Sequence, residues 1–112
     1  MIIFYTPEAS EDLQRLRTFI AEKNPAAAQQ IAADLLAGIA VLKELPYIGR
    51  KVEKAPNPEI MRDLSVSLYI VRYLILGNEI HILRIWHKRE NWSSWHMDMA
   101  QQQTMRSSIR LS

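Results

Sequence analysis

The chain has 112 residues, 48% of them hydrophobic and 23% charged, a balance typical of a single globular domain. It contains no cysteine, which excludes disulfides, thiolate nucleophiles and cysteine-ligated metal sites. The sequence has neither an apolar run of roughly 18 residues, the length that spans a bilayer, nor a signal-peptide-like start. We therefore expect a cytoplasmic protein that has no membrane partner.

The charge is distributed unevenly along the chain. Residues 1–49 contain 4 Lys or Arg and 6 Asp or Glu, whereas residues 50–92 contain 8 and 5. The formal net charge is only +2. The basic second half permits an anionic partner, such as nucleic acid or an acidic protein, without requiring one.

The first predicted elements are a strand and a helix. Residues 1–5 are β-branched and aromatic and predict a short strand. Thr6 as N-cap and Pro7 at the first helical position predict a helix that ends near Lys23. Charged side chains, including Asp12, are expected to lie off its apolar stripe. That stripe comprises Ala9, Leu13, Leu16 and Ile20.

A second helix follows after only a few residues. Asn24-Pro25 repeats the start signal, and the helix is expected to end at Leu45-Pro46. The short connection predicts an antiparallel helical hairpin. The apolar stripe of the second helix comprises Ala28, Ile31, Leu35, Ile39 and Leu42.

The second half of the predicted domain is a sheet. Residues 46–50 predict a turn, and two prolines in the loop at 51–59 oppose regular structure. Gly77-Asn78 predicts a β-hairpin, because a tight two-residue loop joins two apolar runs there. Three strands are predicted, over residues 60–66, 68–76 and 79–86. The expected fold class is α+β: an N-terminal strand, an antiparallel helical hairpin, then a three-stranded antiparallel sheet.

Two units are predicted along the chain. Residues 1–92 form one domain, and residues 93–112 form a C-terminal extension with irregularly spaced apolar side chains. We expect that extension to be a weak helix or to be ordered only on a partner.

A basic and aromatic cluster follows the last predicted strand. If the strands at 60–66 and 79–86 share a sheet, Arg62 and Arg84 could lie on one face that borders this cluster. Arginine binds phosphate or carboxylate, and a histidine can titrate near neutral pH. Alternatively, the arginines pair with carboxylates of the chain and the histidine only ends the strand. The candidate target-binding residues are Arg62, Arg84, His87, Lys88, Arg89, Trp92 and Trp95.

Other sites have little support in the sequence. Trp86 lies within a strand and is expected to be a core residue. His81 and His96 lack metal-ligand spacing, so we expect no metal. A chain with three glycines and no glycine-rich phosphate loop gives no reason to expect a nucleotide cofactor.

Several short motifs occur in a characteristic order. They are A-x-E-D-L at Ala9 to Leu13, Asn24-Pro25, L-x-x-x-P-x-x-G-R at Leu42 to Arg50, R-D-L at Arg62 to Leu64, the strand from Tyr69 to Tyr73, and I-L-R-I-W-H-x-R at Ile82 to Arg89. Together they resemble the RelE/ParE superfamily of toxins from bacterial type II toxin–antitoxin (plasmid stabilisation) modules. The resemblance implies a helical hairpin packed on one face of a mainly antiparallel, curved sheet.

The same resemblance implies two kinds of activity. RelE-like members are ribosome-dependent mRNA endoribonucleases, and ParE-like members inhibit DNA gyrase. The RelE-like pattern has basic residues on the strand before the hairpin, an arginine just after the strand tyrosine, an arginine after the last strand, and a tyrosine six residues later. This chain has Met61 and Asp63, Ile70, and Trp95 at those positions, and it retains only Arg89.

These departures favour a ParE-like toxin that inhibits an essential process, with DNA gyrase as the expected target. An RNase would use His87 and Arg89 as catalytic residues, so whether the chain is an enzyme stays open. A degenerate module that only binds its antitoxin is a third alternative. The resemblance also implies a cognate antitoxin and a toxin–antitoxin hetero-oligomer.

Overall fold

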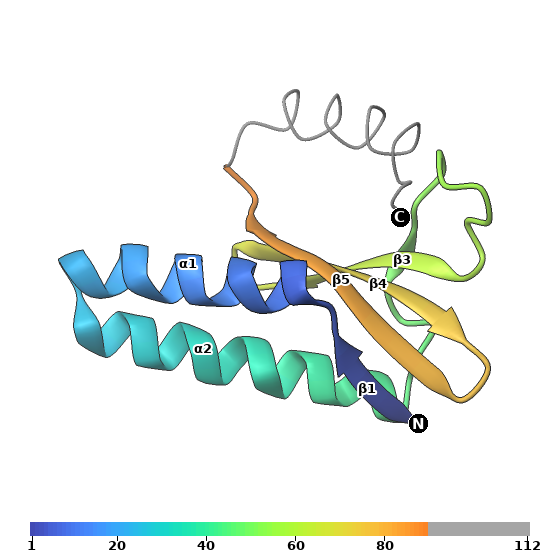
Figure 1. Ribbon diagram of the computed structural model, residues 1–112, viewed down its shortest axis with the longest axis horizontal. Coiled ribbons are helices and arrows are strands. Elements are labelled where there is room, and N and C mark those ends of the chain that lie inside the picture. Colours follow the sequence, from blue (N-terminus) through green and yellow to red (C-terminus); the bar gives the residue numbers. More distant parts are fainter. Residues whose placement is uncertain (90–112) are drawn as a thin grey trace.

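The computed structural model describes residues 1–89, which form one layer of helices and one sheet (Figure 1). The elements are β1 (Ile2–Tyr5), α1 (Pro7–Lys23), α2 (Pro25–Ala40), the 3-10 turn η1 (Val41–Lys43), β2 (Arg50–Lys51), β3 (Met61–Val66), β4 (Tyr69–Leu76) and β5 (Glu79–His87). The predictions for Trp92, Trp95 and residues 93–112 lie outside the described residues.

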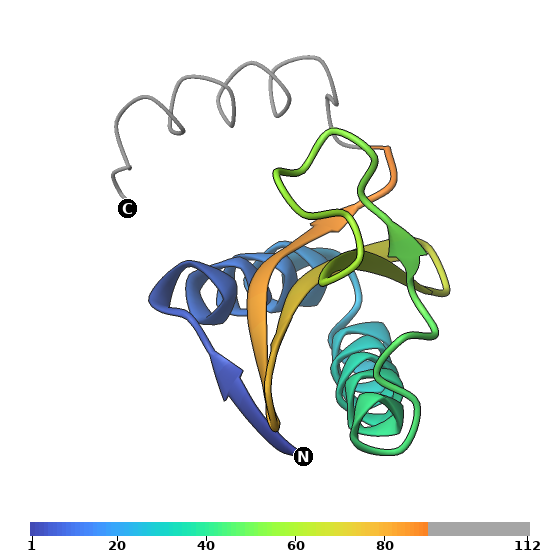
Figure 2. The ribbon, with the colours of Figure 1, turned by 90° about the vertical axis from the view of Figure 1, so that its right-hand side faces the viewer.

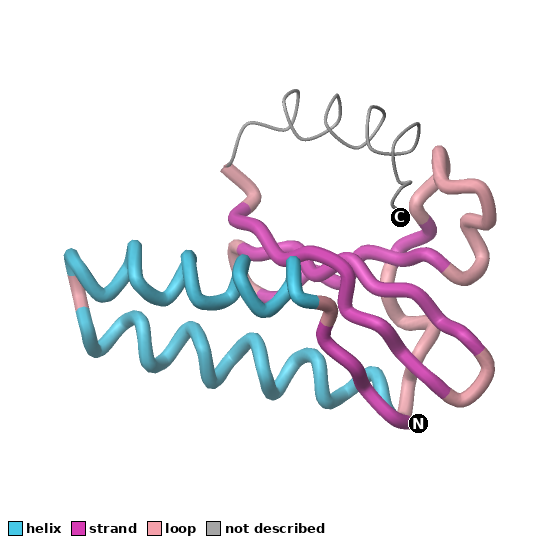
Figure 3. The backbone as a smooth tube through the Cα atoms, viewed as in Figure 1, coloured by secondary structure: helices cyan, strands magenta, loops and turns pink. Residues whose placement is uncertain are grey.

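Both helices begin as the capping residues predict. The Thr6 side chain accepts a hydrogen bond from the Ala9 N–H, and the Asn24 side chain accepts one from the Ala27 N–H. The two helices lie side by side as an antiparallel hairpin (Figures 1 and 3). The regular part of α2 ends at Ala40, earlier than predicted, because the chain tightens into η1 before it reaches Pro46.

The sheet has five strands in the order β1-β5-β4-β3-β2. The predicted antiparallel strands are β3, β4 and β5, and this prediction is confirmed. β1 pairs in parallel with β5, and β2 pairs with β3 at the other end. The sequence predicted a turn and loop where β2 lies, because two residues are too few to show an alternating pattern.

The core lies between the helices and one face of the sheet (Figure 2). Its buried side chains include Leu35, Ile39, Leu42, Val71, Tyr73, Ile75, Ile80, Ile82 and Ile85. The segment Pro25–Lys43 is long and apolar enough to pass for a membrane span, with a mean hydropathy of 1.4. In this fold 22% of that window is buried, and the segment contributes Ala28, Leu35, Ile39 and Leu42 to the buried side chains.

An irregularity in the β4–β5 ladder determines which side chains face the helices. Arg72 lies opposite Arg84, but the next residue, Tyr73, lies opposite Ile82, so Leu83 is an extra residue in β5. Tyr73 and Ile82 thereby enter the core. The register places Arg72 and Arg84 on the opposite face of the sheet, although the Arg84 guanidinium still contacts Asp12 of α1.

Candidate functional site

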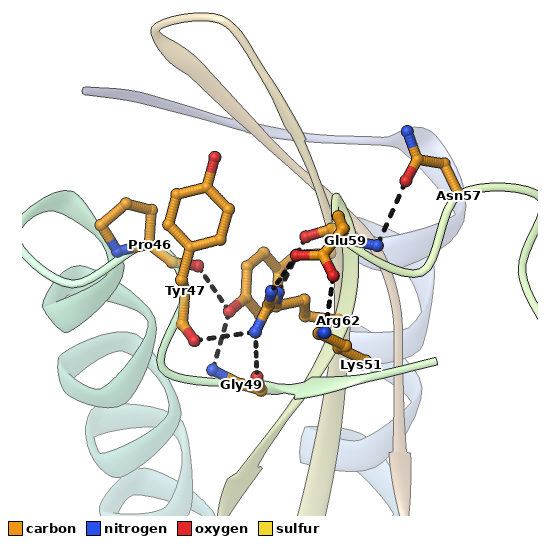
Figure 4. Close-up of polar contacts among 8 residues, drawn as sticks. Pro46, Tyr47, Gly49, Lys51, Asn57, Glu59 and Arg62 are labelled. Carbon is orange, nitrogen blue, oxygen red and sulfur yellow. Dashed lines mark hydrogen bonds and ion pairs between the residues drawn. The ribbon is translucent and has the colours of Figure 1, made fainter. Parts of the chain in front are cut away.

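The Arg62 side chain is buried and binds both the turn that precedes β2 and the end of the loop that precedes β3 (Figure 4). Its guanidinium donates to the backbone oxygens of Tyr47, Gly49 and Glu59 at 3.0, 3.1 and 2.9 Å. It also donates to the Glu59 carboxylate at 3.3 Å and lies 5.0 Å from the centroid of the Tyr47 ring. Five contacts within the chain make Arg62 a support for this turn and loop.

Glu59 is shared between two cations. It pairs with Lys51 as well as with Arg62. The hydrogen bond from Lys51, the charge of Lys51 and then that of Arg62 lower the pKa of the Glu59 carboxyl below its usual value. The carboxylate therefore stays ionised and joins β2 to the start of β3.

Tyr73 supports the turn before β2 from inside the core. Its hydroxyl donates to the Pro46 backbone oxygen at 2.7 Å and accepts from the Gly49 N–H at 3.0 Å. Burial raises the pKa of this phenol. A side chain at position 49 would place Cβ 2.7 Å from the Tyr73 hydroxyl and 2.9 Å from the Asp63 backbone oxygen. Only glycine lets the loop approach β3 so closely.

Arg84 forms an ion pair between β5 and α1. Its guanidinium donates to the two carboxylate oxygens of Asp12 at 2.7 and 3.1 Å, and the same carboxylate accepts the Ile85 N–H at 2.9 Å. Asp12 is 4% exposed, so the prediction that it lies on the solvent side of α1 is wrong. A sequence signal was available, because Asp12 lies four residues before the buried Leu16 on the same helix face.

A second ion pair lies on the face of the sheet away from the helical layer. Arg72 donates through two nitrogens to the carboxylate of Asp63, at 2.8 and 2.9 Å. The Arg72 guanidinium also lies 5.2 Å from the centroid of the Trp86 ring, within cation–π range. Trp86 is fully buried, which agrees with the sequence, although it lies on the face away from the helices. Arg72 was not singled out from the sequence, because nothing in the sequence around it shows that Asp63 lies opposite it on the neighbouring strand.

The expectation that Arg62 and Arg84 share a sheet face is wrong. Arg62 lies opposite Tyr73 on β4, and Tyr73 lies opposite Ile82 on β5. Residues opposite one another share a face, and Tyr73 and Ile82 are core residues, so Arg62 lies on the face that packs against the helices. Arg84 lies opposite Arg72 on the other side. The extra residue in β5 separates the two arginines, and it could not be placed from the sequence. Their target-binding role stays a prediction.

The exit of β5 holds the remaining described candidates. His87 is half-buried, its ring packs edge-on against Tyr69 at 5.0 Å, and its Nδ1 accepts the Arg89 N–H at 2.9 Å. Lys88 and Arg89 are exposed. The binding role of all three stays a prediction, as do the catalytic roles of His87 and Arg89. Within residues 1–89, no group of three His, Asp or Glu side chains is arranged to hold a metal ion.

The fold is a small α+β domain in which the arginines of β3, β4 and β5 are bound within the chain. Residues 3–92 match the family model described as ParE toxin of type II toxin–antitoxin system, parDE. The chain therefore belongs to the ParE toxin family of type II toxin–antitoxin systems.

Named relatives and a solved structure agree with this assignment. "Toxin RelE1" of Caulobacter vibrioides is 34% identical over 88 residues, which cover 79% of this chain and 94% of the relative. "Toxin RelE2" of the same organism is 33% identical over 86 residues, covering 76% and 92%. The chromosomal ParDE toxin–antitoxin system from P. aeruginosa contains a chain with the same fold, at a TM-score of 0.66 and 22% identity, covering 78% and 95%.

Proposed function

We propose that this toxin inhibits DNA gyrase by direct contact and does not cleave RNA. The observation that carries the proposal is the Asp63–Arg72 pair. Asp63 occupies a position on β3 where the RelE-like pattern places a basic residue, and its carboxylate binds Arg72 through two hydrogen bonds. An acid at this position repels phosphate and neutralises the arginine beside it.

RNA cleavage by the 2′-hydroxyl needs cations directed at the phosphate as charge develops on it. The guanidinium groups on β3, β4 and β5 are instead bound within the chain. Arg62 donates to three backbone oxygens, Arg72 donates to Asp63, and Arg84 donates to Asp12. These arginines support the fold, which fits a toxin that acts by binding.

The exposed cations at the end of β5 provide a contact for the target. Lys88 and Arg89 extend into solvent beyond the last strand, where a sheet presents side chains to a partner. This basic rim would meet gyrase through charge first, because charge attraction speeds encounter. The family implies that a cognate antitoxin blocks this action.

One observation favours a second function, mRNA cleavage at the ribosome. The His87 Nδ1 accepts the backbone N–H of Arg89, so an imidazole and an exposed guanidinium are carried by nearby residues of the strand exit, and such groups can supply proton transfer and phosphate binding. Two relatives also carry the RelE name.

Induction of the chain in bacteria separates the two functions. We expect relaxed plasmid and intact mRNA within minutes of induction, before growth stops. Trimmed mRNA with normal plasmid supercoiling would contradict the proposal and support the second function. An induced culture that keeps growing would support a module that only binds its antitoxin.

A further inference from the structure

The turn between β3 and β4 lies beside the exit of β5, at the same end of the sheet (Figure 1). Val66 and Tyr69 lie opposite one another, so the two residues between them form a tight hairpin turn. The Lys88 N–H donates to the Leu68 backbone oxygen at 2.8 Å, which extends the β4–β5 pairing by one position. Leu68 and Lys88 are therefore cross-strand neighbours. We call the four exposed residues at this corner the exit surface: Ser67, Leu68, Lys88 and Arg89.

Ser67 has a backbone conformation that residues with a side chain rarely adopt. Its φ angle is +55°, in the left-handed region that favours glycine. The turn between β4 and β5 has a glycine with nearly the same angle, Gly77 at +59°. Within residues 1–89, Ser67 is the one residue other than glycine with a positive φ. Strain of this kind is often found at binding sites, so it points to a function of the turn.

Leu68 is a large apolar side chain at the tip of this turn. It is 55% exposed and has the exposed cations Lys88 and Arg89 beside it. The turn is fixed by the bond from Lys88 and by the next residue, Tyr69, against which the His87 ring packs edge-on. A side chain on a rigid turn loses little conformational freedom on binding. An aliphatic anchor with a charged rim is the arrangement found at the centre of protein interfaces.

We propose that the exit surface binds a protein that has an apolar pocket for Leu68 and acidic side chains for Lys88 and Arg89. This proposal rests on the proposed function: the protein is a subunit of gyrase, and the toxin binds it in the absence of DNA. The hydrogen bond between Lys88 and Leu68 fixes the spacing between the apolar anchor and the cations. A partner with only one of the two features is bound weakly, so the turn contributes specificity.

A nucleic acid fits the exit surface poorly. Binding to duplex DNA depends on many phosphate contacts from Lys and Arg, and the exit surface has only Lys88 and Arg89 for this purpose. The arginines of β3, β4 and β5 add little, because they bind acceptors of the chain itself. Single strands are bound by aromatic rings that stack on bases, whereas Leu68 is aliphatic and has no flat face. Charge and shape therefore favour a protein.

Binding of the full-length toxin to purified gyrase without DNA tests the contact. We expect Leu68→Ala to weaken binding by about tenfold or more, because the anchor is lost from its pocket. The midpoint of urea unfolding should stay constant, since Leu68 is exposed. Leu76→Ala is the matched control, because Leu76 is 45% exposed and lies at the opposite end of the same strand. Equal affinity of the parent and Leu68→Ala overturns the proposal.

A charge at the same position distinguishes a protein from a nucleic acid. Leu68→Lys removes the anchor and adds a cation to the exit surface. An apolar pocket binds this variant about tenfold or more weakly, whereas a nucleic acid gains a phosphate contact and binds it more tightly. Leu76→Lys, which adds the same charge at the other end of β4, is the control. Tighter binding of Leu68→Lys to plasmid DNA or to the gyrase–DNA complex overturns the proposal.

Growth arrest on induction keeps this result separate from the gyrase proposal. Suppose that the parent toxin neither binds nor inhibits gyrase, yet both Leu68 variants need about tenfold more inducer to arrest growth. Gyrase inhibition is then refuted, and the exit surface binds another protein. If the parent and both variants inhibit gyrase equally, gyrase inhibition stands and the exit-surface proposal is overturned. Self-association of the toxin that Leu68→Ala abolishes would assign the surface to a second copy and also overturn it.

Discussion

Arg84 donates to Asp12 over 2.7 Å, and this pair joins the last strand to the first helix. The Asp12 carboxylate also accepts the Ile85 N–H, beyond the point where β1 stops pairing with β5. A helix side chain thus completes the hydrogen bonding of a strand edge. This contact positions the end of β5, where residues 87–89 are located.

Loss of Asp12 should destabilise the fold. Asp12→Ala leaves the Ile85 N–H and the Arg84 guanidinium without their carboxylate, and we expect the free energy of unfolding to fall by about 2–4 kcal/mol. Glu11→Ala is the matched control, because Glu11 is an exposed acid in the same turn. Urea unfolding of both variants measures the difference. Equal midpoints would show that the Asp12 contacts contribute nothing.

The sequence predicted the elements of this fold far better than its contacts. Capping at Thr6 and Asn24 and the Gly77-Asn78 turn are local signals, and the structure confirms each. The Arg84–Asp12 pair joins residues 72 positions apart, so no local pattern contains it. The face on which Arg84 lies depended on one extra residue in β5, because a one-residue shift moves the side chains of a strand to the opposite face of the sheet.

A side chain at position 49 should disrupt the loop held by Arg62 and Tyr73. Gly49→Ala brings Cβ against the Tyr73 hydroxyl and the Asp63 backbone, and we expect a loss of about 1–3 kcal/mol in unfolding free energy. Tyr73→Phe removes the hydroxyl and should itself cost about 1–2 kcal/mol. Because both changes break the same hydrogen bond, the double variant should lose less than the two losses added together. Full additivity in a denaturant cycle would contradict this contact.

Tyr73 also makes stability fall at alkaline pH. Burial raises the pKa of its phenol above the ordinary value of 10.0, so the folded chain keeps this proton after the unfolded chain loses it. The contribution is complete below pH 10 and is lost as the pH rises through the folded pKa. Tyr5, whose pKa burial also raises, acts in the same direction. Tyr73→Phe should therefore flatten the decline in unfolding free energy above pH 10, and an unchanged decline would contradict this role.

Arg89 should affect toxicity without affecting stability. Its side chain is exposed at the exit of β5. We therefore expect Arg89→Ala to raise the inducer concentration needed for growth arrest by about tenfold, while the midpoint of urea unfolding stays constant. Arg17→Ala, an exposed arginine on α1, is the control and should leave both unchanged. Growth arrest equal to that of the control would remove Arg89 from the target surface.

Site prediction was limited by the same distinction between local and distant contacts. Composition and charge located a basic strand exit, and Lys88 and Arg89 are exposed there. The pattern could not show that Asp63 binds Arg72, because the register of β3 against β4 places them together. Whether a basic side chain can bind a target depends on whether hydrogen-bond acceptors of the folded chain already bind it.

Inhibition of purified DNA gyrase tests the central claim most directly. Relaxed plasmid, gyrase and ATP are incubated with increasing concentrations of the toxin, and the supercoiled product is measured, with the toxin–antitoxin complex as the control. We expect supercoiling to fall with toxin concentration and to be restored in the control. Full supercoiling at a toxin excess, together with cleavage of mRNA on added ribosomes, would contradict gyrase inhibition.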